Sequence, residues 1–274
     1  MTKPYIGILG CGWLGLPLAD YLQNKGYTVR GSVTSEVGLQ KLQANQIDGF
    51  IVRLHENGVT GNALGFLEGI SLLIIAIPPG FRKNADDSYF YKIKALWHVI
   101  HTSGVERVLF MSSTSVFGQH QTYITDHTPP EPDTLSGEKL ADVERFVLSQ
   151  TQNTTVFRLG GLFGPNRHPV TFLAGRSQVP QPLGKIHFIH VADIVEIVEK
   201  WCYMQPTQKV FNLCHPERPT RKAYYTTTAM QRHLTPPTFD ENDRTEGKSI
   251  YPDGVLTILQ HGFKHPILTA YPVE

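Results

Sequence analysis

Cysteine, long apolar runs and excess charge are all scarce in this sequence, and each shortage excludes a class of protein. The three cysteines among 274 residues, Cys11, Cys202 and Cys214, lie far apart, so they form neither a disulfide framework nor a metal-binding pair. They predict reduced thiols in a cytoplasmic protein. The most apolar segment, residues 70–77, is too short to cross a bilayer. Because the net charge is +1 and the lysines and arginines are scattered, we expect no nucleic-acid or membrane partner.

A glycine-punctuated turn follows directly after an apolar strand pattern near the start of the chain. Residues 6–15 read Ile-Gly-Ile-Leu-Gly-Cys-Gly-Trp-Leu-Gly, a helix pattern begins there, and a second strand pattern follows at residues 27–33. The first glycine of the turn suits a tight bend, the second lets the backbone approach phosphates, and the third lets the helix pack on the strand. We predict that a dinucleotide diphosphate rests on this helix N-terminus. The predicted contacts are Gly10, Cys11, Gly12, Trp13, Leu14 and Gly15.

Strand and helix patterns alternate along the chain, which predicts an α/β fold, a Rossmann doubly wound parallel sheet with a small C-terminal substrate-side region. We expect strands at 5–9, 28–33, 50–54, 72–77, 107–112, 155–159 and 210–213, and helices at 14–24, 37–44, 88–102, 137–150 and 191–204. Residues 160–184 and 206–248 contain many glycines, prolines and polar residues and are interpreted as loop-rich.

These patterns also suggest how the chain divides into domains. We expect the dinucleotide-binding domain to span residues 1–165, with residues 188–215 returning to it. The substrate-side region is then formed by residues 166–187 and 216–274.

Several segments together resemble the extended and atypical short-chain dehydrogenase/reductases, also described as NAD-dependent epimerase/dehydratase-like proteins. The resemblance rests on residues 10–15, 109–118, 158–165, 188–195 and 211–213, and more loosely on 247–250 and 261–263. It implies an NAD(P)-binding oxidoreductase or epimerase-type enzyme that acts on a small polar metabolite, with nucleotide-sugars as one substrate class. It also implies a homodimer paired through two helices.

The family's chemistry uses a Ser or Thr after the fifth of these strands, and a Tyr and a Lys four residues apart on the next helix. By resemblance, Ser113 matches the Ser, since it lies five residues before Gly118, and Lys139 matches the Lys. Where the Tyr belongs the chain has Leu135, which can neither donate nor accept a proton. The catalytic reading of Ser113 competes with a simpler one, in which its hydroxyl satisfies a neighbouring backbone group.

The absent tyrosine leaves several interpretations open. Lys139 is an ordinary surface lysine if the alignment is shifted. If the alignment holds, the protein belongs to an atypical branch, and Tyr123, in the loop after Ser113, is the first candidate for another phenol. Tyr89 and Tyr91 are further candidates. The alternative function is a non-catalytic NAD(P)-binding sensor or scaffold.

Cofactor choice depends on the end of the second strand, where an Asp or Glu would bind the adenosine ribose of NAD and repel the extra phosphate of NADP. The chain has Ser32 at this position, and the hydroxyls of Ser32, Thr34 and Ser35 would line a phosphate site. This pattern favours NADP, with NAD as the alternative, whereas Glu36 favours NAD. Each of these hydroxyls is also suited to cap the next helix.

The end of the fourth strand is expected to lie beneath the adenosine or ribose, because ligands of this fold bind at the carboxyl ends of strands. The residues concerned are Ala76, Ile77 and Pro78. Proline has no N–H to donate, so this loop would act by shape.

The histidine spacing does not support a metal site, although the chain has twelve histidines. His98 and His101 lie on an expected helix, and His187 and His190 flank a short strand-like segment without cysteine or carboxylate support. We therefore expect no metal. His190 is expected to cap a helix or to pack near the cofactor side.

Overall fold

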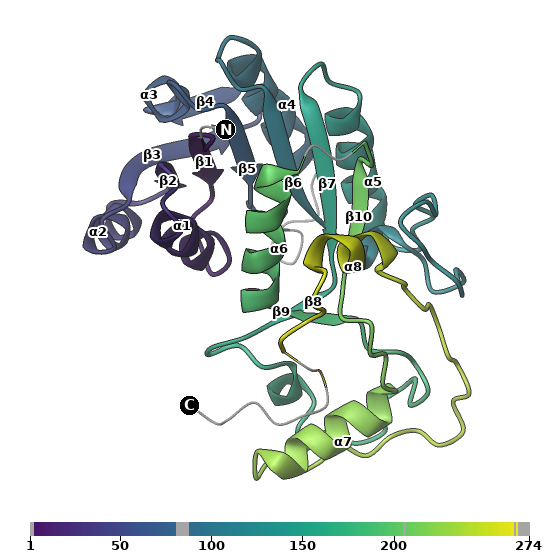
Figure 1. The fold of residues 1–274 in the computed structure, drawn as a ribbon. Helices are drawn as coiled ribbons and strands as arrows, with labels where there is room; N and C mark the ends of the chain where they lie inside the picture. The colour runs from purple at the N-terminus through teal and green to yellow at the C-terminus, as the bar shows by residue number, and fades with distance from the viewer. Residues whose placement is uncertain (1–2, 81–87, 205–206, 266, 268–274) are drawn as a thin grey trace.

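The computed structural model describes residues 3–80, 88–204, 207–265 and 267. At its centre lies an eight-stranded sheet in the order β10-β7-β6-β5-β1-β2-β3-β4 (Figure 1). Every neighbouring pair is parallel except β3 with β4. The strands are β1 (Ile6–Leu9), β2 (Val29–Val33), β3 (Asp48–His55), β4 (Gly58–Gly61), β5 (Leu72–Ile75), β6 (Arg107–Ser113), β7 (Asn153–Leu159) and β10 (Val210–Leu213). The predicted α/β fold is confirmed.

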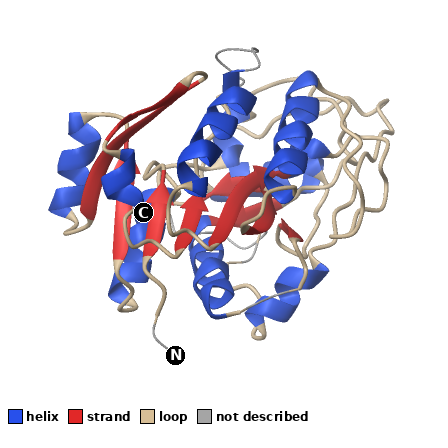
Figure 2. Ribbon diagram, turned by 90° about the horizontal axis from the view of Figure 1, so that it is seen from above, coloured by secondary structure: helices blue, strands red, loops and turns tan. Residues whose placement is uncertain are grey.

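Strand β5 shows why the central strands are apolar without interruption. Leu72 and Ile74 pack into the core on one face of the sheet, and Leu73 and Ile75 pack into the core on the other. Helices cover both faces (Figure 2). One face carries α1 (Gly15–Asn24), α2 (Glu36–Ala44), α6 (Val191–Tyr203) and α8 (Asp253–Leu259), and the other carries α3 (Ala63–Leu67), α4 (Ser88–His101) and α5 (Leu135–Leu148).

A smaller part of the molecule lies beyond the carboxyl ends of β7 and β10, below the sheet in Figure 1. It contains the parallel pair β8 (Gly161–Phe163) and β9 (Phe188–His190), the 3₁₀ turn η2 (Pro169–Phe172) and α7 (Arg221–Gln231). It has its own core, which includes Phe163, Tyr224 and Phe239. The carboxyl ends of the strands in the large sheet therefore face this smaller part, which has a hydrophobic core of its own.

The structure differs from the sequence prediction mainly in the C-terminal third. All seven predicted strands and five predicted helices are present, but the loop-rich interpretation of residues 206–248 is wrong for α7. This helix buries only Tyr224, Tyr225, Thr228 and Ala229, so its apolar pattern is weak. Helix α8, in the predicted substrate-side region, packs against α6 and β10. Within the described ranges, no helix is both long enough and apolar enough to span a membrane.

Candidate functional site

The three glycines of the turn between β1 and α1 have three different surroundings. Gly10 has a φ of 102°, a conformation that side chains disfavour. A Cβ on Gly15 would lie 2.2 Å from the Gly10 carbonyl oxygen, so only glycine lets the helix begin so close to the strand. A Cβ on Gly12 would meet nothing within 4 Å. Protein contacts therefore explain Gly10 and Gly15, while Gly12 faces open space.

The N-terminus of α1 has backbone N–H groups available for an anion. Its N-cap residue, Leu14, makes no side-chain capping bond, and no acidic residue lies in the first turn. Among the described residues, no hydrogen bond is recorded for the backbone N–H of Trp13 or Leu14. Uncapped N–H groups and the helix dipole both favour a phosphate here. The turn thus fits the diphosphate of a dinucleotide.

Ser32, at the end of β2, supports the turn from inside the protein. Its Oγ accepts a hydrogen bond of 3.1 Å from the Gly10 N–H, and its carbonyl oxygen accepts one of 2.8 Å from the Cys11 N–H. The residue is only 2% exposed. Burial raises the pKa of the neighbouring Cys11 to about 12, which keeps that thiol protonated. Ser32 was predicted to line a phosphate site; its Oγ accepts from the turn itself, and a role toward a phosphate stays a prediction.

Trp13 connects the glycine turn to the segment that follows β8. Its Nε1–H donates to the Pro165 carbonyl oxygen at 3.3 Å, and the Arg167 guanidinium lies 4.8 Å from the centre of the indole ring. Gly164 also lies beside the ring, since a Cβ there would be 3.4 Å from it. The turn is therefore in contact with the polypeptide that leads into the smaller part.

The ends of β2 and β5 flank the turn. Beyond β2, Thr34 and Ser35 are exposed, and Ser35 Oγ accepts a hydrogen bond of 3.2 Å from the Gly38 N–H, which caps α2. Beyond β5, the Ala76 carbonyl oxygen would lie 3.1 Å from a Cβ on Gly10. The predicted loop of Ala76, Ile77 and Pro78 is thus adjacent to the turn, and the Tyr89 hydroxyl fixes it by donating to the Ile77 carbonyl oxygen at 3.1 Å.

Ser113 is the last residue of β6, at the same edge of the sheet. Its side chain is half-buried, and its Oγ accepts a hydrogen bond of 3.2 Å from the Ser115 N–H, which caps the 3₁₀ turn η1 (Thr114–Val116). A Cβ on Gly137 would lie 2.5 Å from the Ser115 carbonyl oxygen, so α5 begins directly against this turn. Ser113 and the N-terminal part of α5, which carries the half-buried Lys139, are therefore brought together.

Neither Leu135 nor the alternative tyrosines place a phenol at the start of α5. Leu135 is the first residue of α5 and is 56% exposed. Tyr123 is 64% exposed, and its ring lies 4.5 Å from the ring of Tyr251. Tyr89 is buried, which raises its pKa. The structure places no tyrosine at the first turn of α5.

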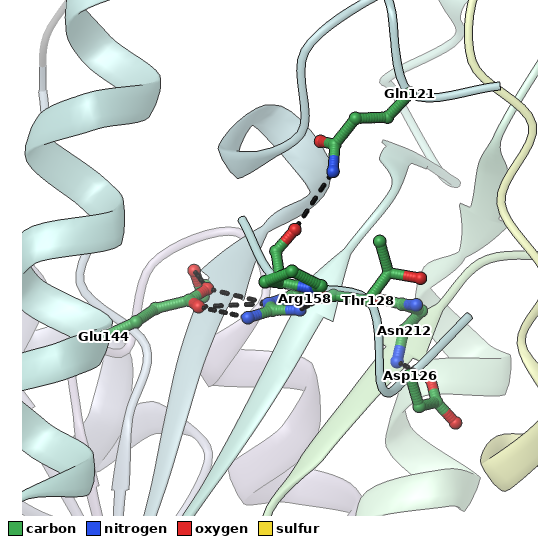
Figure 3. A network of polar contacts seen from close by, with 8 residues as sticks. Gln121, Asp126, Thr128, Glu144, Arg158 and Asn212 are labelled. Carbon is green, nitrogen blue, oxygen red and sulfur yellow. Dashed lines mark hydrogen bonds and ion pairs between the residues drawn. The ribbon is translucent and has the colours of Figure 1, made fainter. Parts of the chain in front are cut away.

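A buried ion pair lies beside Ser112, the residue that precedes Ser113. Arg158 on β7 and Glu144 on α5, 4% and 2% exposed, meet through hydrogen bonds of 3.0 and 2.8 Å to Glu144 Oε2 (Figure 3). The Ser112 hydroxyl donates to the other carboxylate oxygen. Arg158 Nη1 also donates to the Thr128 carbonyl oxygen at 3.3 Å. This Glu144–Arg158 network joins β6, β7, α5 and the loop of residues 117–133.

Asp126 anchors the same loop to β10 and α8. Its Oδ1 accepts a hydrogen bond of 2.6 Å from the Asn212 N–H (Figure 3). Its Oδ2 accepts one of 2.8 Å from the Gly254 N–H. Gln208 donates a third, at 3.0 Å. Burial raises the pKa of Asp126, and the three hydrogen-bond donors partly offset this rise because they stabilise the carboxylate. The loop that follows Ser113 is thus held near its middle by two adjacent anchors, Asp126 and Thr128.

The site as described combines an uncapped glycine turn with a strand-end serine beside a helix start. The family model described as the NAD dependent epimerase/dehydratase family matches residues 6–214. The chain belongs to this family. Protein YeeZ of Escherichia coli strain K12 is 30% identical over 273 residues, which cover 98% of this chain and 99% of that protein.

Solved structures show the same fold. A functionally unknown conserved protein from Silicibacter pomeroyi DSS has a TM-score of 0.78 at 21% identity, covering 96% of this chain and 95% of its own. MoeE5 in complex with UDP-glucose and NAD has a TM-score of 0.74 at 19% identity, covering 96% of this chain and 94% of its own. At such identities the likeness establishes the architecture.

The epimerase/dehydratase family model ends at residue 214, yet a later segment contacts the site. Lys248 Nζ donates to the carbonyl oxygens of Thr114 and Phe117 at 3.0 and 2.7 Å. The adjacent Ser249 carbonyl oxygen accepts from the Ile124 N–H at 2.9 Å. Burial lowers the pKa of Lys248. The sequence indicated residues 247–250 only through a looser resemblance to the family's closing segment, which did not predict this contact.

The start of α6 combines a predicted cap with contacts to residues 264–265 that the sequence did not predict. His190 Nδ1 accepts from the Ala192 N–H at 3.2 Å, which confirms the predicted cap. Asp193 Oδ1 accepts from the Lys264 N–H and from His265 Nδ1 at 3.1 and 2.9 Å. Ligand-type atoms of His190, Asp193 and His265 lie within 4.8 Å of one another. The hydrogen bonds of Asp193 hold residues 264–265 against α6. That the protein binds no metal stays a prediction.

We expect the free energy of unfolding to fall at acid pH because several buried histidines must take up protons. Burial, together with the nearby positive charges of Lys248 and Arg218, lowers the pKa of His187 from 6.5 to about 3. Because its Nε2 accepts from the Ile250 N–H at 3.1 Å, the neutral ring is the form that fits. The unfolded chain binds this proton below pH 6.5, so the stabilisation is present above that pH and is lost as the pH falls toward the folded-state pKa.

We expect the loss from His187 between pH 7 and pH 4 to be about 2 to 3 kcal/mol of unfolding free energy. Urea unfolding at several pH values measures it, and His187→Gln should flatten the dependence by that amount. An unchanged slope in this variant would assign the acid sensitivity to other groups, among them His168 and His190, whose pKa burial lowers to about 4.

Proposed function

We propose that this chain is an NAD(P)-dependent oxidoreductase or epimerase-type enzyme acting at a carbinol carbon of a small polar metabolite, with nucleotide-sugars as the substrate class. One observation carries the proposal: the uncapped turn of residues 10–15 and the half-buried Ser113 lie at the carboxyl ends of strands in one parallel sheet. The shared fold of MoeE5, a protein solved with UDP-glucose and NAD, supports the substrate class.

The residues present fit a nicotinamide dinucleotide. The N–H groups of Trp13 and Leu14 would bind its diphosphate, and the loop of Ala76, Ile77 and Pro78 would lie beneath its ribose. Lys139, by its place on α5, would hold the nicotinamide ribose. When bound, the cofactor supplies hydride exchange.

We propose NADP as the preferred cofactor, with NAD as the alternative. The end of β2 carries no carboxylate at Ser32, Val33 or Thr34, so nothing at these positions repels a phosphate. Thr34 and Ser35 are exposed beside the turn and offer hydroxyl donors.

Ser113 would polarise the substrate oxygen by donating a hydrogen bond to it. We expect Ser113→Ala to lower turnover by about 10²- to 10³-fold while leaving cofactor affinity unchanged. The measurement is NADPH absorbance and product formation with a panel of nucleotide-sugars. Ser115→Ala is the matched control, because Ser115 is exposed and contributes its backbone N–H to the turn. Equal activity of the two variants would remove Ser113 from the chemistry.

The exposed Leu135 favours a second candidate, a non-catalytic NAD(P)-binding sensor or scaffold. This function predicts cofactor binding without turnover of any nucleotide-sugar in the panel. The enzyme proposal needs another proton donor, for which Tyr123 is the candidate on the adjoining loop. If Tyr123→Phe retains full activity, the donor is another group.

We also propose a cytoplasmic location, which the free thiols of Cys11, Cys202 and Cys214 support. A homodimer stays a prediction. Size-exclusion chromatography with light scattering measures the mass that decides it.

A further inference from the structure

Arg53 lies across the carboxyl end of the neighbouring strand β2. In the parallel pairing of β2 with β3, Val33 is opposite Ile51, so Arg53 is two residues beyond the last pair. Its Nε–H donates to the Thr34 carbonyl oxygen at 2.9 Å. This bond holds the guanidinium beside the residues that follow β2.

Arg53 differs from Arg30, the other arginine of these two strands. Arg30 pairs with Asp48 at 2.9 Å, donates to the carbonyl oxygens of Gly65 and Glu68, and packs on aromatic rings. Arg53 is exposed, and among the described residues the Thr34 carbonyl oxygen is its only recorded hydrogen-bond partner. Its terminal N–H groups are therefore available to a ligand.

The position of Arg53 along the sheet edge matches that of an adenosine ribose. Strands β1, β2 and β3 are consecutive neighbours, and the glycine turn follows β1. Since neighbouring strands lie about 4.8 Å apart, the end of β3 is about 10 Å from the turn. A dinucleotide with its diphosphate on the turn extends its adenosine toward the end of β2. The Arg53 side chain covers the distance from β3 to the end of β2, where it reaches the Thr34 carbonyl oxygen.

We infer that Arg53 binds the 2′-phosphate of NADP and thereby sets cofactor preference, an inference that rests on the proposed function. Its planar guanidinium suits a phosphate, with two N–H groups facing two oxygens. Ser35 Oγ already accepts from the Gly38 N–H, so its own proton is available for a phosphate oxygen. The Thr34 hydroxyl lies on the same exposed segment.

Glu36 opposes Arg53 at this place. It is the first residue of α2, directly after Ser35, and is exposed. Its carboxylate repels a phosphate group, so the pair of residues 36 and 53 determines the balance between the two cofactors. We expect Glu36→Gln to bind NADPH a few-fold more tightly, with NADH changing less.

Calorimetric titration of the full chain with NADPH and with NADH tests the inference. The wild type should bind NADPH more tightly than NADH. Arg53→Ala should weaken NADPH binding by about ten- to one-hundredfold, the effect of losing a charge-assisted contact, and change NADH binding by less than about twofold. Lys41→Ala is the matched control, because it removes one exposed positive charge from the last turn of α2.

The outcomes separate this inference from the proposed function. If Arg53→Ala and wild type show the same ratio of NADPH to NADH affinity, or if the wild type prefers NADH, the assignment of Arg53 is overturned while dinucleotide binding stands. If the wild type binds neither cofactor, both fall together. If Arg53→Ala and Lys41→Ala lose NADPH affinity equally, the loss comes from the change in net charge and not from a specific contact, which also overturns the assignment. Equal melting temperatures without ligand confirm that all variants fold.

Discussion

Replacing Glu144 by glutamine is expected to lower the free energy of unfolding by about 3 to 5 kcal/mol. The substitution keeps the side-chain shape but leaves the buried Arg158 guanidinium without a counter-charge, and desolvation of an unpaired charge is costly. Ser112 also loses the carboxylate to which it donates. Urea unfolding at neutral pH measures the difference.

Two comparisons make this prediction specific. Asp142→Asn breaks the exposed pair of Asp142 with Arg145 on the same helix and should cost less than about 0.5 kcal/mol. The double variant Glu144→Leu with Arg158→Met should be more stable than either single variant, because no unpaired charge stays buried. If Glu144→Gln lowers the free energy of unfolding as little as Asp142→Asn does, the Glu144–Arg158 network does not stabilise the loop of residues 117–133.

Gly12→Val should abolish most cofactor binding without unfolding the protein. Gly12 has no positive φ, and a Cβ there meets no protein atom within 4 Å, so the apo stability should change by less than about 0.5 kcal/mol. The side chain would instead occupy the space through which phosphates reach the Trp13 and Leu14 N–H groups. Losing two charge-assisted hydrogen bonds weakens binding by about one-hundredfold or more. Titration with both cofactors and thermal melting measure the two quantities.

Gly15→Ala provides the contrast. Its Cβ would overlap the Gly10 carbonyl oxygen at 2.2 Å, and backbone must move to relieve the clash. We expect a loss of more than about 2 kcal/mol of stability even without cofactor. Unchanged affinity in Gly12→Val would mean that the turn does not hold a ligand.

The fold and the glycine turn could be predicted because short stretches of sequence specify them. The continuous apolar run of β5 follows from burial on both faces, and the spacing of Gly10, Gly12 and Gly15 specifies a turn. The direction of a single side chain is less predictable. The sequence did not show that Ser32 Oγ accepts from the Gly10 N–H, a bond that satisfies a backbone donor at a buried turn, and its role toward a phosphate stays a prediction.

Contacts between distant segments could not be predicted from spacing. Arg53 reaches Thr34 because of the register between β2 and β3, which neither strand specifies alone. Lys248 reaches the turn after Ser113 across 134 residues. Arg158 and Glu144 lie on different elements, and only packing of α5 on β7 brings them together. Helix α7 was missed because its buried positions are mostly tyrosine, threonine and alanine.

A crystal structure with bound NADPH tests the central claim most directly. We predict that the diphosphate lies on the turn of residues 10–15, with its oxygens about 2.7 to 3.2 Å from the backbone nitrogens of Trp13 and Leu14. A dinucleotide bound elsewhere, or a turn covered by protein side chains at saturating cofactor, would contradict the account.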